Sequence, residues 1–366
     1  MRVLIVDDSV VFRSQIKGAL DGVEGIEVVA IANNGKIALQ KILQQSIDLI
    51  ILDMEMPELS GIETIKEIKK LKHTAIIIIF SSHTKRGSEL TLEALALGAD
   101  DFVTKPSGED CSFDNAQNKI REDLVPRIIQ FKNKFFPVKI RTPEKIPILN
   151  ETIPINRTIK SQIDFKKFQA EAIVIGSSTG GPSALEILLK NMPRDLSIPI
   201  FIVQHMPPLF TTSLAKRLAS VSGLMAKEAT HLEVVSPGVI YVAPGNYHMI
   251  LKKKGLQTII ELNQLSQRNS VRPSVDYLFE SASEIYQYKT LGIILTGMGE
   301  DGFVGARKLK SLNGAMMIQD KKSSVVFGMP GAIFMAEIYD YMGTVEELRE
   351  KILEITAKSV NHSKVV

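Results

Sequence analysis

The chain of 366 residues contains a single cysteine, Cys111, and no tryptophan. One thiol excludes an intrachain disulfide framework and a zinc module built from cysteines, and it suits a reducing compartment. No run of about 18 or more apolar residues occurs, so the sequence predicts no membrane insertion. Asp7 and Asp8 come too early for the apolar core of a secretory signal. We therefore expect a cytoplasmic protein.

Excess positive charge is confined to one stretch of the chain. The net charge is +3, yet residues 126–170 hold ten Lys/Arg against three Asp/Glu. No basic helix carries interleaved aromatic residues, so we expect no nucleic-acid partner. The same stretch has five of the sixteen prolines and no glycine, which favours semi-extended chain. We predict a Pro-rich basic linker over 126–168, domains over 1–125 and 169–357, and a frayed tail over 358–366.

Apolar runs alternate with amphipathic segments before this linker. Apolar residues in the amphipathic segments recur at helical spacing, and the alternation predicts an α/β domain with a doubly wound parallel sheet. The predicted strands are Val3–Val6, Ile26–Ala30, Leu49–Leu52, Ile76–Phe80 and Phe102–Val103, and the predicted helices are Val11–Leu20, Gly35–Leu43, Ile62–Leu71 and Ser88–Leu97. Ligands of such sheets bind beyond the carboxyl ends of the strands.

The same alternation resumes after the linker and predicts a second α/β domain with a β-hairpin insertion. The predicted strands are Ala172–Ile175, Ile200–Val203, Leu291–Leu295 and Ala315–Ile318, and the predicted helices are Pro182–Leu189, Leu209–Leu218, Val275–Ile285 and Phe303–Leu312. The hairpin-like region covers Val239–Ala243, Met249–Lys252 and Thr258–Leu262.

Polar residues gather at the strand ends of the first domain. Asp7 and Asp8 follow its first strand, Asp53 its third and Lys105 its fifth, while Ser81 ends its fourth. Three carboxylates at one sheet edge suit a hard divalent cation such as Mg²⁺. With a lysine and a hydroxyl beside them, they form a place to accept a phosphoryl group. A lone Asp often caps a helix, but five such residues at one edge favour a site.

A glycine-rich turn follows the first strand of the second domain. Its sequence, Gly-Ser-Ser178-Thr-Gly-Gly-Pro, enters a helix directly, so backbone N–H groups point into the turn. Gly176, Ser178 and Gly180 satisfy the Gly-x-Ser-x-Gly pattern of a nucleophilic serine. A phosphate or nucleotide site has the same context, and the motif alone leaves both open. No Gly-Lys-Ser/Thr follows, so the turn is not a P-loop.

A nucleophilic serine needs a base and a carboxylate that orients the base. His205 ends the second strand of this domain, at the same edge as Ser178, and Asp301 follows a later strand in a glycine-rich turn. Asp301 could cap the next helix, and Glu300 is the rival carboxylate. Three strand ends that each supply one member favour a Ser178–His205–Asp301 triad. This order differs from the Ser, Asp, His order of α/β-hydrolases.

The first half resembles the receiver domains of two-component response regulators, which are flavodoxin-like. The matching segments are Val-Asp7-Asp8-Ser, Leu-Asp53-Met-Glu-Met-Pro57, Gly61, Phe-Ser81-Ser and Thr-Lys105-Pro106. The resemblance implies that Asp53 is the phosphoacceptor, that Asp8, Asp53 and the carbonyl of Glu55 bind Mg²⁺ with Asp7 behind them, and that Ser81 and Lys105 contact the phosphoryl oxygens. Phe102 stands where many receivers have a tyrosine that rotates on activation, so this chain lacks the hydroxyl of such a switch.

The second half resembles the catalytic domain of chemotaxis protein-glutamate methylesterases, which has a Rossmann-like three-layer fold. The matching segments are Gly-Ser-Ser178-Thr-Gly-Gly, Gln-His205-Met-Pro-Pro, Arg272-Pro-Ser-Val-Asp276 and Thr-Gly-Met298-Gly-Glu-Asp301-Gly. Ser177 and Glu300 stand where other members often have Ala and Asn. The resemblance implies the Ser178, His205 and Asp301 triad, with backbone N–H groups of Thr179 and Met298 for the oxyanion and no cofactor for the esterase.

The combined resemblance implies phosphorylation-activated hydrolysis of glutamate γ-methyl esters on methyl-accepting chemotaxis receptors, and glutamine deamidation by the same triad. The implied phosphodonor is the chemotaxis histidine kinase, and we expect a monomer. Two alternatives stay open at this point. One is a phosphorylation-gated receptor-binding regulator without turnover. The other is a regulator that binds a nucleotide at Gly176–Gly181.

Overall fold

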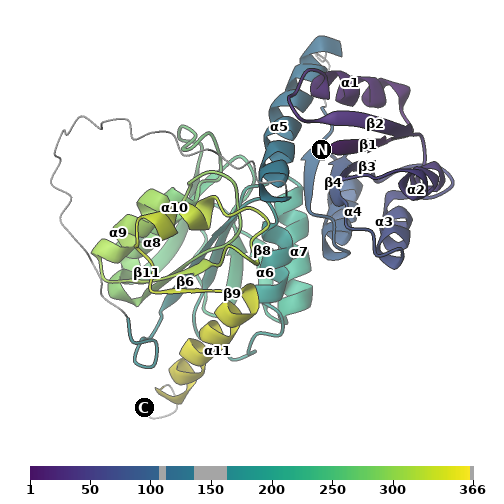
Figure 1. Ribbon diagram of the computed structural model, residues 1–366. Helices are drawn as coiled ribbons and strands as arrows, with labels where there is room; N and C mark the ends of the chain where they lie inside the picture. Colours follow the sequence, from purple (N-terminus) through teal and green to yellow (C-terminus); the bar gives the residue numbers. More distant parts are fainter. Residues whose placement is uncertain (107–112, 136–162, 363–366) are drawn as a thin grey trace, which may run out of the picture.

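The computed structural model describes residues 1–106, 113–135 and 163–362. The chain folds into two α/β domains that pack side by side, as Figure 1 shows. The first contains β1 Arg2–Val6, α1 Val10–Leu20, β2 Glu27–Ala32, α2 Gly35–Gln44, β3 Leu49–Asp53, α3 Gly61–Lys70, β4 Ile76–Ser81, α4 Lys85–Ala96, β5 Asp101–Thr104 and α5 Phe113–Phe135. The expected alternation is confirmed for every strand and helix predicted in this domain.

The first sheet is parallel throughout, with strand order β2-β1-β3-β4-β5. Its central strands are buried on both faces because helices cover both sides, which explains their continuous runs of Ile, Leu and Val. The order reverses at β1, so the carboxyl ends of β1 and β3 flank a crevice where ligands bind in such sheets.

Helix α5 differs from the prediction that the linker begins at residue 126. The helix passes through Pro126 and continues to Phe135. Its buried face, which includes Leu124, Ile128 and Phe131, packs in the core beside α1. Burial of these side chains outweighs a proline penalty of about 3 kcal/mol, since each large apolar side chain contributes about 1.5–3 kcal/mol. The remainder of the predicted linker up to residue 162 lies outside the described residues.

The second domain is built around a parallel sheet of seven strands with the order β14-β13-β12-β6-β7-β9-β8. Its strands are β6 Ala172–Ser177, β7 Ile200–Gln204, β8 Met225–Glu228, β9 Val239–Val242, β12 Thr290–Ile294, β13 Ala315–Gln319 and β14 Tyr341–Gly343. Its helices are α6 Gly181–Leu188, α7 Phe210–Ser222, α8 Val275–Tyr286, α9 Phe303–Ser311, α10 Met329–Met335 and α11 Val345–His362, with a short 3₁₀ turn η1 Gln287–Lys289. The chain leaves β6 toward β7 and later returns to β12 on the other side of β6. The switch point therefore lies at the end of β6.

The predicted hairpin is confirmed in part. β10 His248–Lys254 and β11 Gln257–Asn263 form a separate antiparallel pair. The segment expected as its third member, β9, instead joins the main sheet in parallel with β7 and β8. β9 is buried along its whole length, which suits a strand covered on both faces better than a hairpin.

Both ends of the second domain differ from the predicted bounds. Phe165 and Phe168 are buried, and the Phe165 ring packs edge-on against Tyr341 at 6.3 Å. The domain core therefore begins before residue 169. At the other end, α11 continues to His362, four residues beyond the predicted start of the tail.

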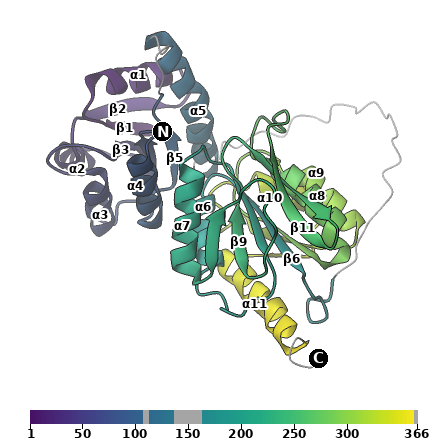
Figure 2. The same ribbon diagram turned by 180° about the vertical axis from the view of Figure 1, so that it is seen from behind.

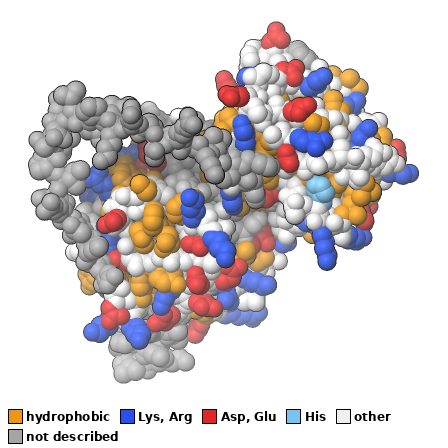
Figure 3. Space-filling model, viewed as in Figure 1, with side chains coloured by type: hydrophobic (Ala, Val, Ile, Leu, Met, Phe, Trp, Pro, Cys, Tyr) orange, Lys and Arg blue, Asp and Glu red, His pale blue; other side chains and the backbone are white. Residues whose placement is uncertain are grey.

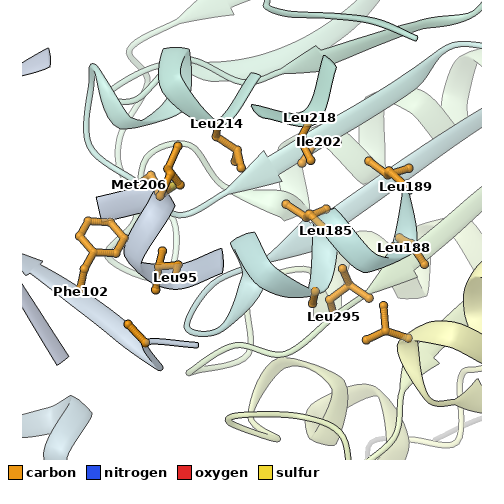
Figure 4. Close-up of a cluster of buried hydrophobic side chains, with 14 of the residues drawn as sticks. Leu95, Phe102, Leu185, Leu188, Leu189, Ile202, Met206, Leu214, Leu218 and Leu295 are labelled. Atoms are coloured by element: carbon orange, nitrogen blue, oxygen red, sulfur yellow. The ribbon is translucent and has the colours of Figure 1, made fainter. Parts of the chain in front are cut away.

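The two domains share an apolar interface. Helix α4 of the first domain packs against α6 and α7 of the second, and Figure 2 shows these elements facing each other. Figure 4 shows Leu95 and Phe102 of the first domain beside Met206, Leu214 and Leu185 of the second. The hydroxyls of Ser88 and Ser213, both buried, lie 2.8 Å apart across the interface. The two cores are therefore continuous at this boundary.

Within the described ranges, no helix has both the length and the apolar composition of a membrane span. On the face seen in Figure 3, Lys/Arg and Asp/Glu side chains are interspersed over both domains.

Candidate active site and phosphorylation site

The acidic residues predicted at the first sheet edge lie together. Lys105 Nζ lies 2.9 Å from Asp7 Oδ2 and 2.9 Å from Asp53 Oδ2. Burial raises the pKa of Asp53 to about 6, although the Lys105 charge opposes this shift. Burial likewise raises the pKa of Asp7, again against Lys105. The Lys105 ammonium group therefore pairs with two buried carboxylates at the carboxyl ends of β1 and β3.

The same edge can hold a divalent cation. Carboxylate oxygens of Asp7, Asp8 and Asp53 all lie within 4.8 Å of one another. Asp53 Oδ1 accepts hydrogen bonds from the Met54 and Glu55 N–H groups at 2.7 and 3.4 Å, so the Glu55 backbone lies beside the carboxylate. An all-oxygen donor set with surplus negative charge fits Mg²⁺.

Ser81 is at this edge, but its hydroxyl is engaged elsewhere. Ser81 is fully buried, and its Oγ donates to Gly87 O at 3.1 Å and lies 2.7 Å from Thr91 Oγ1. Both partners belong to α4. A contact between Ser81 and a phosphoryl group on Asp53 thus requires the hydroxyl to turn away from α4.

The strand-to-helix turn around Ser178 is held by backbone contacts. Ser178 N–H donates to Thr296 O at 3.0 Å, so the turn is tied to the segment after β12. Gly180 has φ of 76°, a conformation that favours glycine. A Cβ on Gly297 would lie 2.9 Å from Ser178 Cβ. The neighbouring loop therefore approaches the serine more closely than a side chain at position 297 would allow.

His205 and Asp301 are joined directly. His205 Nε2 lies 2.8 Å from Asp301 Oδ2, and the two side chains are 11% and 2% exposed. A carboxylate only accepts, so Nε2 carries the proton and Nδ1 of the neutral ring is the free acceptor. His205 N–H also donates to Ser177 O at 3.1 Å, which brings the histidine backbone alongside the residue before Ser178.

Asp301 caps a helix, but not the one that it precedes. Its carboxylate accepts from Val275 N–H at 2.6 Å and Ser274 Oγ at 2.7 Å, at the start of α8. Burial raises the pKa of Asp301, but the hydrogen bond and charge of His205, with these two donors, outweigh burial and lower it. The rival carboxylate, Glu300, is exposed to solvent. Asp301 is therefore a rigidly held anion that faces His205.

Ser178 Oγ forms no hydrogen bond with any residue that the structure describes, and the side chain is half-buried. Catalytic hydrogen bonds are often long before substrate binds. The N–H groups of Thr179 and Met298 also donate no hydrogen bond within the described part of the chain. A serine hydroxyl, an imidazole ring and two N–H groups without partners among the described residues thus lie at one sheet edge.

Sequence reasoning missed several supporting residues. Gln204 is buried, accepts from Ser177 Oγ at 2.7 Å and donates to Ser178 O at 2.9 Å. The Ser177 hydroxyl, at the position where other members often have Ala, therefore helps to hold Gln204 beside the turn. The position of Gln204 directly before His205 was the available signal. Ser274 and Asp276 lie in a matched segment but received no role, and Asn269 had no sequence signal at all.

The comparisons with known proteins agree with this two-domain architecture. Residues 173–352 match the CheB methylesterase family, and residues 3–114 match the response regulator receiver domain family. A protein-glutamate methylesterase/protein-glutamine glutaminase of Trichodesmium erythraeum is 42% identical over 96% of this chain and 98% of its own length. A protein of the same name from Thermotoga maritima is 39% identical over 97% and 98%.

A solved structure matches the second domain. The match is to the crystal structure of the Thermotoga maritima CheB methylesterase catalytic domain, with a TM-score of 0.50 and 44% sequence identity. The matched region covers 51% of this chain and 99% of the crystallised chain. The near-complete coverage of the curated relatives includes both domains in one order. The chain therefore belongs to the protein-glutamate methylesterase/protein-glutamine glutaminase family, and joins a response regulator receiver domain to a CheB methylesterase domain.

Proposed function

We propose that this chain hydrolyses glutamate γ-methyl esters on methyl-accepting chemotaxis receptors and deamidates receptor glutamines, with Ser178, His205 and Asp301 as the catalytic residues. The observation that carries the proposal is the 2.8 Å contact from His205 Nε2 to Asp301 at the sheet edge that also holds Ser178. The names of the relatives support the substrate class.

The geometry supports the following steps. Ser178 Oγ attacks the ester carbonyl carbon while His205 Nδ1 takes its proton, and N–H groups of Thr179 and Met298 hold the oxyanion. The bond to the methoxy group then breaks, and His205 returns the proton to departing methanol. Water next attacks the acyl-serine, with His205 again as base, and leaves glutamate and free serine. Asp301 holds the imidazole tautomer throughout and stabilises the imidazolium.

Asp53 is the proposed phosphoacceptor of the receiver. Asp8, Asp53 and the carbonyl of Glu55 would hold Mg²⁺, with Asp7 behind them, and Lys105 would contact the phosphoryl oxygens. Bound Mg²⁺ would neutralise charge on those oxygens. Ser81 would join them after leaving α4. We propose the chemotaxis histidine kinase as the phosphodonor, a cytoplasmic location and a monomeric chain.

We further propose that the unphosphorylated receiver inhibits the esterase by covering it. Arg127 of α5 donates from Nη1 to Asp101 Oδ2 at 2.6 Å and to Thr179 Oγ1 at 3.3 Å. Thr179 directly follows the nucleophile. Lys134 of the same helix donates to Ser324 O at 2.6 Å, on a loop beside the site. Phosphorylation would repack the surface around Phe102 and release this contact.

The deciding experiment is methanol release from methylated receptor, with and without a small-molecule phosphodonor. We expect release that rises with phosphodonor and is abolished in Ser178→Ala, since loss of a triad member costs more than about a hundredfold. Ser311→Ala, at the end of α9 and remote from the sheet edge, serves as control. Receptor binding without methanol release would indicate the non-catalytic regulator, and activity in Ser178→Ala would refute the triad.

A further inference from the structure

A tight turn closes over the buried side of Asp301. Arg268 N–H donates to Val271 O at 3.3 Å, and Val271 N–H donates back to Arg268 O at 3.1 Å. The two residues between them, Asn269 and Ser270, have φ of 53° and 61°. Two consecutive positive φ values mark a type I′ turn, in which asparagine is favoured. The backbone thus fixes where the Asn269 side chain points.

The Asn269 amide bridges two buried carboxylates. Its Nδ2 lies 3.2 Å from Asp276 Oδ2 and 3.2 Å from Asp301 Oδ1. Asn269 itself is exposed, whereas Asp276 is 0% and Asp301 2% exposed. The turn therefore separates the pair from solvent and joins them with one donor group.

The turn is anchored to α8, the helix whose start holds Asp301. Arg268 Nη1 donates to Glu280 Oε2 at 2.8 Å, and its guanidinium lies 5.1 Å from the centre of the Tyr277 ring. Arg268 Nε is 3.8 Å from Asp276 Oδ2. On the opposite side, Asp276 Oδ1 accepts from Gly305 N–H of α9 at 2.8 Å. Asp276 is thus fixed from both sides.

We propose that Asn269 and Asp276 are positioning residues of the esterase: Asn269 donates to the carboxylate of Asp301, and Asp276 holds the Asn269 amide in place. The proposal rests on the triad assignment given above. Asp301 Oδ2 faces His205, while Oδ1 is the oxygen that Asn269 holds. Ser274 Oγ and the Asp276 N–H also donate to Oδ1, so loss of the Asn269 amide removes one of three donors and loosens the orientation of the carboxylate.

The charge balance around Asp276 supports this role. Burial raises its pKa to about 6, and the Asp301 charge adds to the rise. Arg268 and the Gly305 N–H oppose it, and Glu280 is the remaining charged group that faces it. Asp276 is therefore ionised at neutral pH, where its carboxylate accepts the hydrogen bond from Asn269.

The test compares two glycine variants in the same turn. Glycine accepts positive φ without strain, so Asn269→Gly removes the amide and keeps the backbone. Ser270→Gly is the matched control, because the Ser270 side chain makes no hydrogen bond with the described residues. The assay is methanol release by the full chain with phosphodonor and Mg²⁺, with kcat and KM measured separately at each pH.

We expect Asn269→Gly to lower kcat by about tenfold or more, the rate equivalent of one hydrogen bond to a charged group, with KM nearly unchanged. Ser270→Gly should match the wild type. Asp276→Asn should also lower kcat with KM nearly unchanged, because Asn269 then loses the carboxylate that holds its amide beside Asp301.

The outcomes separate this inference from the triad assignment. If Ser178→Ala is inactive but Asn269→Gly equals Ser270→Gly in kcat and in pH profile, the turn only closes the loop and the positioning role is wrong. If Ser178→Ala is active, the triad and this inference fail together. A wild-type kcat in Asp276→Asn would also overturn the proposal.

Discussion

Phe102 of the receiver stacks on Phe210 of the methylesterase domain, with ring centroids 4.9 Å apart and planes 12° from parallel. Phe102 ends up 7% exposed, at the position where many receivers have a tyrosine. A phenylalanine cannot use a hydroxyl to report the phosphorylation state. In this chain the Phe102 ring can couple the phosphorylation state to the other domain through its packing, because its stacking partner, Phe210, is the first residue of α7.

Phe102→Ala should therefore activate the unphosphorylated enzyme. Such aromatic pairs contribute about 0.5–1.5 kcal/mol beyond the area they bury, and about 1.4 kcal/mol is tenfold in population. We expect basal methanol release to rise several-fold, while the rate with phosphodonor changes little. Leu71→Ala, an exposed apolar residue of the receiver, is the control. An unchanged basal rate would show that this stack does not hold the inhibited state.

Asp53→Asn should uncouple the esterase from phosphodonor. The variant lacks the proposed phosphoacceptor, so methanol release should stay at the basal rate with or without phosphodonor. Chelation of Mg²⁺ should have the same effect on the wild type. Asp48→Asn is a matched control, because Asp48 lies at the opposite end of β3, where it accepts Arg2 N–H at 2.6 Å. Stable phosphoryl labelling of Asp53→Asn would identify another acceptor.

Much of the fold was predictable because strands buried on both faces leave continuous apolar runs, as in Ile76–Ser81. Helix α5 was not, because a local signal at Pro126 indicated a break, whereas packing of Leu124 and Ile128 decided the structure. Phe165 and Phe168 were assigned to the linker by composition, although they contact the core of the second domain. Local composition cannot reveal such distant contacts.

Some residues of the candidate site could likewise be predicted from the sequence, and others could not. Ser178, His205 and Asp301 each follow a predicted strand, so topology alone brought them to one edge. The hydrogen-bond partners of Asp301 could not be predicted from the sequence, because its carboxylate is bound at the start of α8, 26 residues earlier in the chain. Asn269 reaches the carboxylate from a turn with two positive φ values, a conformation that the sequence analysis did not predict.

Gly297→Ala should impair both activity and stability. An added Cβ would lie 2.3 Å from Met329 Sδ and 2.9 Å from Ser178 Cβ, so the loop or the nucleophile must shift. We expect methanol release to fall by about tenfold or more, since small displacements at a catalytic group cost up to a hundredfold. Gly331→Ala in α10 is the control, where the nearest atom would be 3.2 Å away. Wild-type activity in Gly297→Ala would show that the loop adapts.

The free energy of unfolding of the catalytic domain should depend on pH through the titration of Asp276. Burial raises the pKa of this carboxyl from 3.8 to about 6. Between about pH 4 and 6 the folded state keeps a proton that the unfolded chain has released, so the free energy of unfolding contributed by this group falls as pH rises.

Asp276→Asn lacks this titration. Relative to the wild type, its free energy of unfolding should therefore increase across that window by roughly 1–3 kcal/mol. Denaturant unfolding at several pH values measures the difference, with Asp195→Asn at an exposed position as control. A constant difference between variant and wild type from pH 4 to 6 would contradict the raised pKa.

The isolated methylesterase domain should be faster than the unphosphorylated full chain. In the full chain, Arg127 of α5 contacts Thr179 beside the nucleophile, and Lys134 contacts the Ser324 carbonyl. Removal of the receiver removes both contacts. The fragment should begin at Ile163 rather than at Gln169, because Phe165 and Phe168 are buried in the domain core. A related catalytic domain has been crystallised alone, which supports independent folding.

The comparison is methanol release from methylated receptor by equal concentrations of the fragment and the full chain, without phosphodonor. Arg127→Ala in the full chain is the intermediate variant, since it removes one contact and keeps the receiver in place. We expect the fragment to be fastest, the unphosphorylated full chain slowest and Arg127→Ala between them, because a cover held by several weak contacts is released in steps. If the fragment is no faster than the full chain, the receiver does not occlude Ser178, and phosphorylation must instead promote catalysis directly.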